Sequence, residues 1–182
     1  MRIIVIGASG TIGSAVSSLL EASGHSVVRA SRSGPVHVDL ADPRSLDALF
    51  ASVADVDGVV CTAAHAPLQP LAELDDASFR QVKLDGQLAL FWRAVRALRD
   101  GGRIVLTAGR FEGALCRGSV GAMVNAALEA FVENAREELP RGISAAVVSP
   151  GWVSETLAGM GRSGGTPVAE VAREYVELVT GA

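Results

Sequence analysis

The chain has 182 residues, of which 49% are hydrophobic and 20% are charged, and its formal net charge is -4. We expect one domain covering residues 1–182, because this length buries a core without disulfides or a structural metal. The composition excludes a disordered chain, and without a basic stripe nucleic acid is not an expected partner. No apolar run reaches the length of about 18 residues that a membrane helix needs, so we expect no membrane partner and a cytoplasmic location.

The two cysteines, Cys61 and Cys116, are far apart in the sequence and belong to no Cys-x-x-Cys motif. No histidine stands at a metal-ligand spacing from either of them. The sequence therefore predicts neither a disulfide framework nor a metal site, and both cysteines are interpreted as buried, small apolar residues.

Short β-branched apolar runs alternate with amphipathic stretches along the whole chain. Strands are expected at residues 3–6, 26–30, 36–39, 57–61, 103–107 and 143–148. Helices are expected at 11–22, 43–53, 75–98, 119–139 and 167–179, and residues 151–165 are expected to form a glycine-rich loop. This alternation predicts an α/β fold with a doubly wound parallel sheet, the Rossmann fold, covered by helices on both faces.

The segment Gly7-Ala8-Ser9-Gly10-Thr11-Ile12-Gly13 lies between the first expected strand and the first expected helix. There the backbone turns tightly, and a helix N-terminus favours a bound anion such as a pyrophosphate. We interpret the segment as a dinucleotide-binding loop; the alternative is an ordinary strand-to-helix turn. Since the third glycine allows close packing of helix on strand, we expect Gly13→Val to damage cofactor binding more than folding.

The second expected strand ends in Ala30-Ser31-Arg32-Ser33, where NAD-binding sites of this fold usually carry an acidic residue. A guanidinium binds a phosphate in bidentate geometry, and a serine hydroxyl can donate a further hydrogen bond. Arg32 and Ser31 therefore favour NADP(H), with its 2′-phosphate, over NAD(H). The alternative is a solvated surface arginine.

Together with the glycine loop, Val38-Asp39-Leu40, Cys61-Thr62-Ala63-Ala64 and Ser149-Pro150-Gly151 make the chain resemble the short-chain dehydrogenase/reductase family along nearly its whole length. The resemblance implies that Asp39 lies beside the adenine, and that Ala63 and Ala64 line the ribose and nicotinamide. It further implies that Pro150 and Gly151 close over the nicotinamide. The residues expected to bind the cofactor are Gly7, Ser9, Gly10, Thr11, Ile12, Gly13, Ser31, Arg32, Asp39, Leu40, Ala63, Ala64, Lys83, Pro150, Gly151 and Val153.

The resemblance also implies a catalytic Tyr-x-x-x-Lys pair, a serine and an asparagine, and this chain departs from the family at all four positions. Gly121 and Asn125 stand at the tyrosine and lysine positions, and Ala108 is the expected occupant of the serine position. Lys83, the only lysine in the sequence, stands at the asparagine position. The one tyrosine, Tyr175, falls in the last expected helix and is not the family's acid.

By elimination, we expect Lys83 to supply the positive charge or the proton at the reacting centre, with Thr107 and Asn125 as further candidate catalytic residues. The alternative for Lys83 is an ordinary surface lysine. These features predict an NADP(H)-dependent oxidoreductase with a non-standard catalytic centre that acts on a small carbonyl or alcohol substrate. The other interpretation is a non-redox member of the fold, either a cyclase or isomerase or an NADP(H)-sensing binding protein. A homodimer through the long helices at 75–98 and 119–139 is also expected.

Overall fold

The computed structural model describes residues 1–63 and 68–182. At its centre lies a sheet of six strands in which every neighbouring pair is parallel and the order is β3-β2-β1-β4-β5-β6. The strands are β1 (Arg2–Ile6), β2 (Ser26–Ser31), β3 (Val36–His37), β4 (Val56–Cys61), β5 (Leu98–Thr107) and β6 (Ser144–Val148). The strand order reverses between β1 and β4, the place where ligands bind at the carboxyl ends of such sheets.

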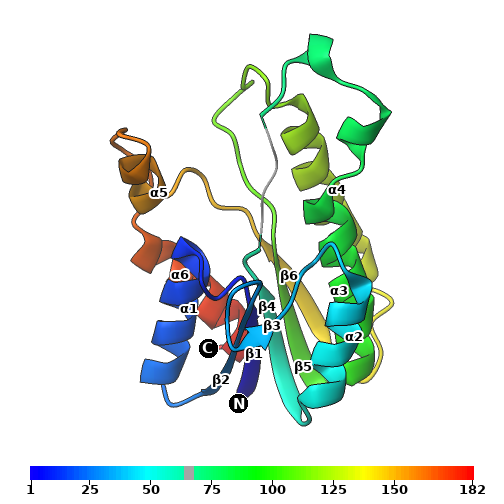
Figure 1. Cartoon of the computed structure of the whole chain (residues 1–182). Helices are drawn as coiled ribbons and strands as arrows, with labels where there is room; N and C mark the ends of the chain where they lie inside the picture. The colour runs from blue at the N-terminus through cyan, green and yellow to red at the C-terminus, as the bar shows by residue number, and fades with distance from the viewer. Residues whose placement is uncertain (64–67) are drawn as a thin grey trace.

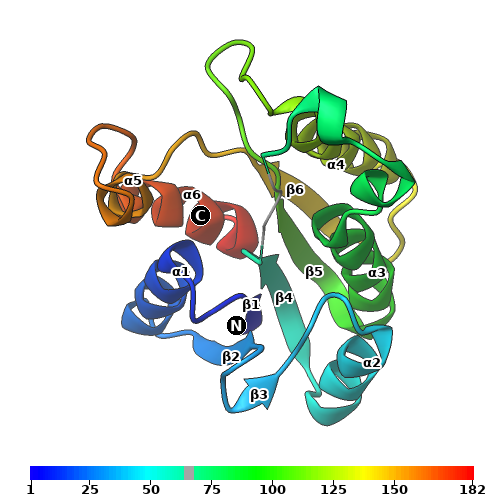
Figure 2. The same ribbon diagram turned by 45° about the horizontal axis from the view of Figure 1, so that its top comes forward.

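Helices cover both faces of the sheet, as Figures 1 and 2 show. They are α1 (Thr11–Ala22), α2 (Pro43–Ser52), α3 (Val82–Ala97), α4 (Ser119–Ala135), α5 (Ser154–Gly159) and α6 (Val168–Thr180). Helices α1 and α6 pack on one face, and α2, α3 and α4 pack on the other. The predicted doubly wound Rossmann fold is therefore confirmed.

The alternation of side chains along β1 explains why the sheet needs helices on both faces. Ile4 and Ile6 belong to the apolar core under α2, α3 and α4. Ile3 and Val5 belong to the core under α1 and α6. All four side chains are almost fully buried, and each such burial stabilises the fold by about 1.5–3 kcal/mol. Continuous β-branched runs of this kind fit central parallel strands, which are covered on both sides.

Several expected boundaries differ from the structure; for example, the helix expected at 119–139 ends at Ala135, and the strand expected at 36–39 ends at His37. The helix expected at 75–98 is two elements, because a short 3₁₀ helix η2 (Asp76–Phe79) comes before α3, which begins only at Val82. Asp75 is the N-cap of η2, in a reciprocal capping box with Ser78, and η2 ends before Arg80, whose extended backbone separates it from α3. β5 begins at Leu98, five residues earlier than expected. The expected loop 151–165 contains the short helix α5.

The structure also bears on three expectations from the sequence, which concern a membrane helix, a metal site and the two cysteines. Across residues 1–63 and 68–182, no helix is long and apolar enough to cross a membrane. In the same part of the chain, no cluster of three or more His, Cys, Asp or Glu side chains could hold a metal ion. Cys61 is buried as expected, but the expectation that Cys116 is buried is wrong, because Cys116 is exposed between β5 and α4; neither forms a disulfide. Burial raises the pKa of the Cys61 thiol to about 12, so this thiol stays protonated.

Candidate active site

The glycine loop joins β1 to α1 at the carboxyl edge of the sheet, and each of its glycines has a different reason to lack a side chain. Gly7 has a positive φ of 83°, and a Cβ there would lie 2.7 Å from the backbone nitrogen of Ala63. A Cβ on Gly13 would lie only 2.2 Å from the carbonyl oxygen of Gly7. At Gly10 the nearest atom to such a Cβ is that same oxygen, at 3.3 Å. The loop itself therefore requires Gly7 and Gly13, whereas Gly10 faces more open space.

This geometry corrects the expectation for Gly13→Val. A side chain at Gly13 would collide with the Gly7 carbonyl and with the Thr62 hydroxyl, which lies 2.5 Å from the Cβ position. Such a clash involves rigid backbone and strains the strand-to-helix turn whether or not a cofactor is bound. Loss of cofactor binding in that variant would not be separable from loss of folding.

The N-terminus of α1 has the properties of an anion site. Gly10 is its N-cap residue and makes no side-chain cap, and no acidic residue stands in the first turn. Ser9, Gly10 and Thr11 are exposed there. The first backbone N–H groups of a helix have no partner within the helix, and they carry the positive end of its dipole. An anionic group is therefore favoured at this position.

Arg32 follows β2 at the rim of the same edge. Its side chain is exposed and forms no hydrogen bond or salt bridge within residues 1–63 and 68–182. Its backbone carbonyl accepts a hydrogen bond of 2.9 Å from the Nδ1–H of His37. Ser31 is buried against Gly34, whose Cβ would lie 2.7 Å from the serine hydroxyl. The strand end is fixed by these contacts, while the guanidinium is free to meet a ligand.

The segment after β3 is held by its own hydrogen bonds. The carboxylate of Asp39 accepts the Ala41 N–H at 3.0 Å, and the Ser45 hydroxyl donates to the Asp39 carbonyl at 2.8 Å. Leu40 is buried against α3, and a Cβ on Gly86 would lie 2.5 Å from the Leu40 Cβ. Asp39 and Leu40 are therefore rigidly placed, with one side of the Asp39 residue accessible to solvent.

Lys83 lies in the first turn of α3 and is almost completely buried, with a relative exposure of 6%. Its Nζ donates to the backbone carbonyl of Ala108 and to Oδ1 of Asn125, each at 2.7 Å. No carboxylate forms a salt bridge with it in the described residues. Burial lowers the pKa of Lys83 from 10.5 to about 8. Lys83 is thus no ordinary surface lysine.

Thr107 lies beside Lys83 and Asn125, but its hydroxyl makes its hydrogen bonds to other residues. Its hydroxyl donates to the carbonyl of Cys61 at 2.5 Å and lies 2.7 Å from the hydroxyl of Tyr175, on α6. Both Thr107 and Tyr175 are buried, and burial raises the pKa of the Tyr175 phenol. The Thr107 hydroxyl is thus bonded to β4 and α6, and its catalytic role stays a prediction.

Sequence reasoning missed Gln87, whose side chain forms hydrogen bonds with the backbones of both Lys83 and Thr107. Its Nε2 donates to the carbonyls of Thr107 and Lys83, at 2.9 and 3.2 Å, and its Oε1 accepts the Thr107 N–H at 2.9 Å. The side chain is fully buried. A glutamine four residues after Lys83 on an otherwise apolar helix face is the one signal that could have indicated it.

The remaining expected site residues surround this edge. Pro150 is half-buried and its carbonyl accepts the Arg110 N–H at 2.9 Å, while Gly151 is exposed. Val153 is buried and pairs with Thr166 in an isolated bridge. Ile12 packs against the core under α1, and Ala63 packs against the opposite core. Ala64 lies outside the described residues.

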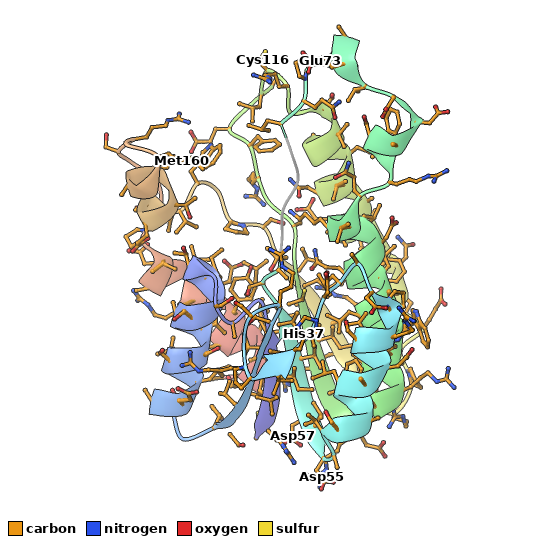
Figure 3. All side chains as sticks on the ribbon, in the orientation of Figure 1. His37, Asp55, Asp57, Glu73, Cys116 and Met160 are labelled. Atoms are coloured by element: carbon orange, nitrogen blue, oxygen red, sulfur yellow. The ribbon has the colours of Figure 1, made fainter. Side chains whose placement is uncertain are left out.

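Figure 3 shows which end of the molecule these segments occupy. Cys116, Glu73 and Met160 are labelled on the segments beyond the carboxyl ends of the strands, and Asp55 and Asp57 lie at the opposite end. The segments 68–81 and 108–118 meet there, because the Gln69 N–H donates to the Arg117 carbonyl at 3.0 Å.

Comparisons with known proteins agree with this geometry. The profile of a family described as Enoyl-(Acyl carrier protein) reductase matches residues 7–178. The crystal structure of the protein lin1944 from Listeria innocua is 35% identical to this chain, covers 100% of it with 95% of its own length, and superimposes with a TM-score of 0.93. A search of curated proteins found no match.

Two further solved structures share the fold at lower identity. A small-chain dehydrogenase in complex with NADPH is 23% identical, with a TM-score of 0.84 over 98% of this chain and 90% of that one. A short-chain dehydrogenase/reductase described as glucose/ribitol dehydrogenase, from Brucella melitensis, is 23% identical, with a TM-score of 0.83 over 98% and 88%. The chain belongs to the short-chain dehydrogenase/reductase family, a family of oxidoreductases.

The glycine loop gives the first test. We expect Gly10→Ala to fold normally and to weaken NADPH binding at least tenfold, because its Cβ fits the loop but stands at the helix N-terminus where a pyrophosphate would bind. Gly159→Ala is the control, since a Cβ there meets no atom within 4 Å. NADPH titration and thermal unfolding would be measured for both. Unchanged NADPH affinity in Gly10→Ala would exclude this loop as the pyrophosphate site.

Proposed function

We propose that the protein is an NADP(H)-dependent oxidoreductase that reduces a small carbonyl compound, or oxidises the corresponding alcohol, with Lys83 as the proton donor. The observation that carries the proposal is the buried amine of Lys83, held between Ala108 and Asn125 at the carboxyl edge of the sheet. This amine lies on the edge that also presents the glycine loop. A single edge thus offers both a site for the dinucleotide and a proton source.

The residues present fit a dinucleotide. Gly10 presents no side chain at an uncapped helix N-terminus, which suits the pyrophosphate. Arg32 presents an exposed guanidinium with Ser31 beside it, which suits a 2′-phosphate. Asp39, Leu40, Ala63, Pro150, Gly151 and Val153 are proposed to line the rest of the cofactor, with Ala64 beside them. When bound, NADPH supplies the hydride.

The hydrogen bonds of Lys83 suit an acid that works near neutral pH. An ammonium has three N–H groups, and two of them are bound to Ala108 and Asn125. The third can protonate the oxygen of the substrate as its carbon is reduced. The neutral amine that remains keeps both hydrogen bonds, so loss of the proton does not disrupt the contacts of Lys83 with Ala108 and Asn125. A pKa of about 8 suits this transfer, since acids are most effective when their pKa is near the working pH.

Cofactor preference tests the role of Arg32. We expect NADPH to bind at least tenfold more tightly than NADH, and Arg32→Ala to remove most of this difference, because the guanidinium would lose its contacts to the 2′-phosphate. Arg173→Ala, a change of an exposed arginine on α6, is the control. Titration followed by tryptophan fluorescence would measure the affinities. An unchanged preference in Arg32→Ala would contradict the assignment.

Turnover tests the role of Lys83. We expect Lys83→Met to lose at least 100-fold in kcat while still binding NADPH, and Tyr175→Phe to keep its turnover with a modest loss of stability, of about 1 kcal/mol. In the wild type, carbonyl reduction should fall as the pH rises through about 8, because the ammonium is then lost, whereas alcohol oxidation should rise. NADPH absorbance under steady-state conditions would report these rates. Full activity in Lys83→Met would leave Lys83 a structural residue.

A second candidate function rests on what the site lacks. Gly121 is buried without a side chain, Ala108 offers no hydroxyl, and the Thr107 hydroxyl is already bonded. Such a site suits a cyclase or isomerase, or a protein that senses NADP(H) by binding it. The two functions differ in one observation, since an oxidoreductase oxidises bound NADPH when a carbonyl substrate is added, whereas a binding protein holds NADPH unchanged.

We also propose a homodimer through the outer faces of α3 and α4. A groove of about 630 Å³ runs between these helices and is lined by Phe91, Trp92, Ala130, Phe131 and Leu139 among others. Trp92 is 46% exposed, and the rings of Phe91 and Phe131 meet edge to face with their centroids 5.0 Å apart. Exposed aromatic side chains around an apolar groove are typical of protein interfaces.

A charge in the groove tests the dimer. We expect Ala130→Glu to shift the protein from dimer to monomer, because it would bury a carboxylate in an apolar interface. Ala169→Glu, on the exposed side of α6, is the control and should stay dimeric. Sedimentation velocity would measure the association state. A wild type that is monomeric at high micromolar concentration would contradict the proposed interface.

A further inference from the structure

Lys83 and Asn125 are 42 residues apart in the sequence and come from different helices, yet they meet in one buried contact. Lys83 is 6% exposed and Asn125 is 7% exposed. Helices α3 and α4 stand side by side on the same face of the sheet, and the contact lies near their N-terminal turns (Figure 2). The amine therefore lies between two helices and the end of β5.

The chemistry of the amine fixes the orientation of the Asn125 amide. An ammonium only donates hydrogen bonds, so it must face the amide oxygen and not the amide nitrogen. In the structure, Oδ1 lies 2.7 Å from the Lys83 Nζ, and Nδ2 is turned toward Gly109. A Cβ on Gly109 would lie 3.2 Å from this Nδ2, so the glycine leaves room for the amide in this orientation.

The other groups around the amine cannot replace Asn125. From β4, the Cys61 thiol stays protonated, and from β5 the Ala108 carbonyl is one fixed acceptor. The Thr107 hydroxyl is turned to Tyr175, and within residues 1–63 and 68–182 no carboxylate of α3, α4 or α6 pairs with Lys83. In the described part of the chain, the Lys83 amine thus has two hydrogen-bond acceptors, the Ala108 carbonyl and Oδ1 of Asn125. Of these two, only Asn125 accepts through its side chain.

We infer that Asn125 is the positioning residue of Lys83, and that the two side chains form an exchangeable pair. The contact needs one amine and one amide at this place between α3 and α4, and it does not depend on which helix supplies which. A lysine on α4 with an asparagine on α3 would then put the amine in the same surroundings. The inference rests on the proposed function for the use of the amine, but the contact itself does not.

Because Lys83 is the only lysine in the sequence, the pKa of its amine can be measured without a substrate. In protein labelled with ¹³C at the lysine Cε, Lys83 gives one lysine signal, whose chemical shift against pH reports the pKa of its amine. We expect Asn125→Leu to lower this pKa by about one unit, because the ammonium loses a hydrogen bond. Asn125→Asp should raise it by at least as much, because a carboxylate favours the ammonium.

Asn134 provides the matched controls, since it lies on the same helix, is exposed, and donates only to the Ala130 carbonyl. Asn134→Leu and Asn134→Asp should leave the lysine signal unchanged. A side chain at position 125 with a purely structural role would change the thermal stability but not the titration of the amine. If Asn125→Leu and Asn125→Asp leave the titration where it is in the wild type, Asn125 does not position Lys83.

The exchange itself is tested by the double variant Lys83→Asn/Asn125→Lys. Its single lysine should titrate near pH 8, as in the wild type, and not at about 10.4 as a solvated lysine does. The single variant Asn125→Lys, with two amines in contact, should be clearly less stable than the double variant. A double variant that does not fold, or whose lysine titrates like a solvated one, would show that the pair is not exchangeable.

These titrations are made without cofactor and without substrate, so their outcome is separate from that of the proposed reaction. A protein that never oxidises NADPH could still show the shifts expected for Asn125→Leu and Asn125→Asp. Where a substrate is found, turnover should fall at least tenfold in Asn125→Leu and recover in the double variant relative to either single change. NADPH affinity should stay within a few-fold in Asn125→Leu.

Discussion

The fully buried amide of Gln87 is the contact on which the active edge of the sheet depends. The register between β4 and β5 ends at Val60 and Val105, so the backbone of Thr107 has no strand partner on that side. Gln87, on α3, supplies the missing pair of hydrogen bonds, and its Nε2 also donates to the Lys83 carbonyl one turn earlier on the same helix. Each buried backbone group left unpaired would cost about 1–3 kcal/mol. The chain can therefore leave the sheet after β4 and open its carboxyl edge without that penalty.

Much of the fold could be predicted from the sequence, because its central strands are uninterrupted β-branched runs and its glycine loop has the expected neighbours. The parts that could not be predicted lack such signals. Leu98-Arg99-Asp100-Gly101-Gly102 contains no β-branched residue, yet tertiary pairing extends β5 through it. Helix α5 has six residues, too few for a period to show, and stands among glycines. The break before α3 lies at Arg80 and Gln81, whose backbone is extended although neither is a glycine or a proline.

The sequence was enough to select individual residues of the candidate site, but not to predict the contacts between them. Sequence reasoning selected Lys83 and Asn125 separately, one by elimination and one by its position in a motif. Their contact spans 42 residues and appears only when α3 and α4 are packed on the same face. The contact of the Thr107 hydroxyl was not foreseen for a related reason, because its partner Tyr175 lies 68 residues away on the opposite face. Successive side chains of a strand point to opposite faces of the sheet. The sequence alone did not show which face the Thr107 side chain points to.

Among residues 1–63 and 68–182 no carboxylate forms a salt bridge with Lys83, and this decides what the amine can do. A buried aspartate or glutamate would hold the ammonium and keep its proton, whereas the neutral carbonyls of Ala108 and Asn125 accept hydrogen bonds from charged and neutral amine alike. Desolvation is then the largest effect on the amine, and the fall in pKa from 10.5 to about 8 corresponds to about 3 kcal/mol. The chain has no tyrosine at this edge in its described part, and its one phenol is buried against Thr107. It can still obtain an acid near neutral pH, because burial of an amine beside neutral acceptors brings the proton affinity into that range.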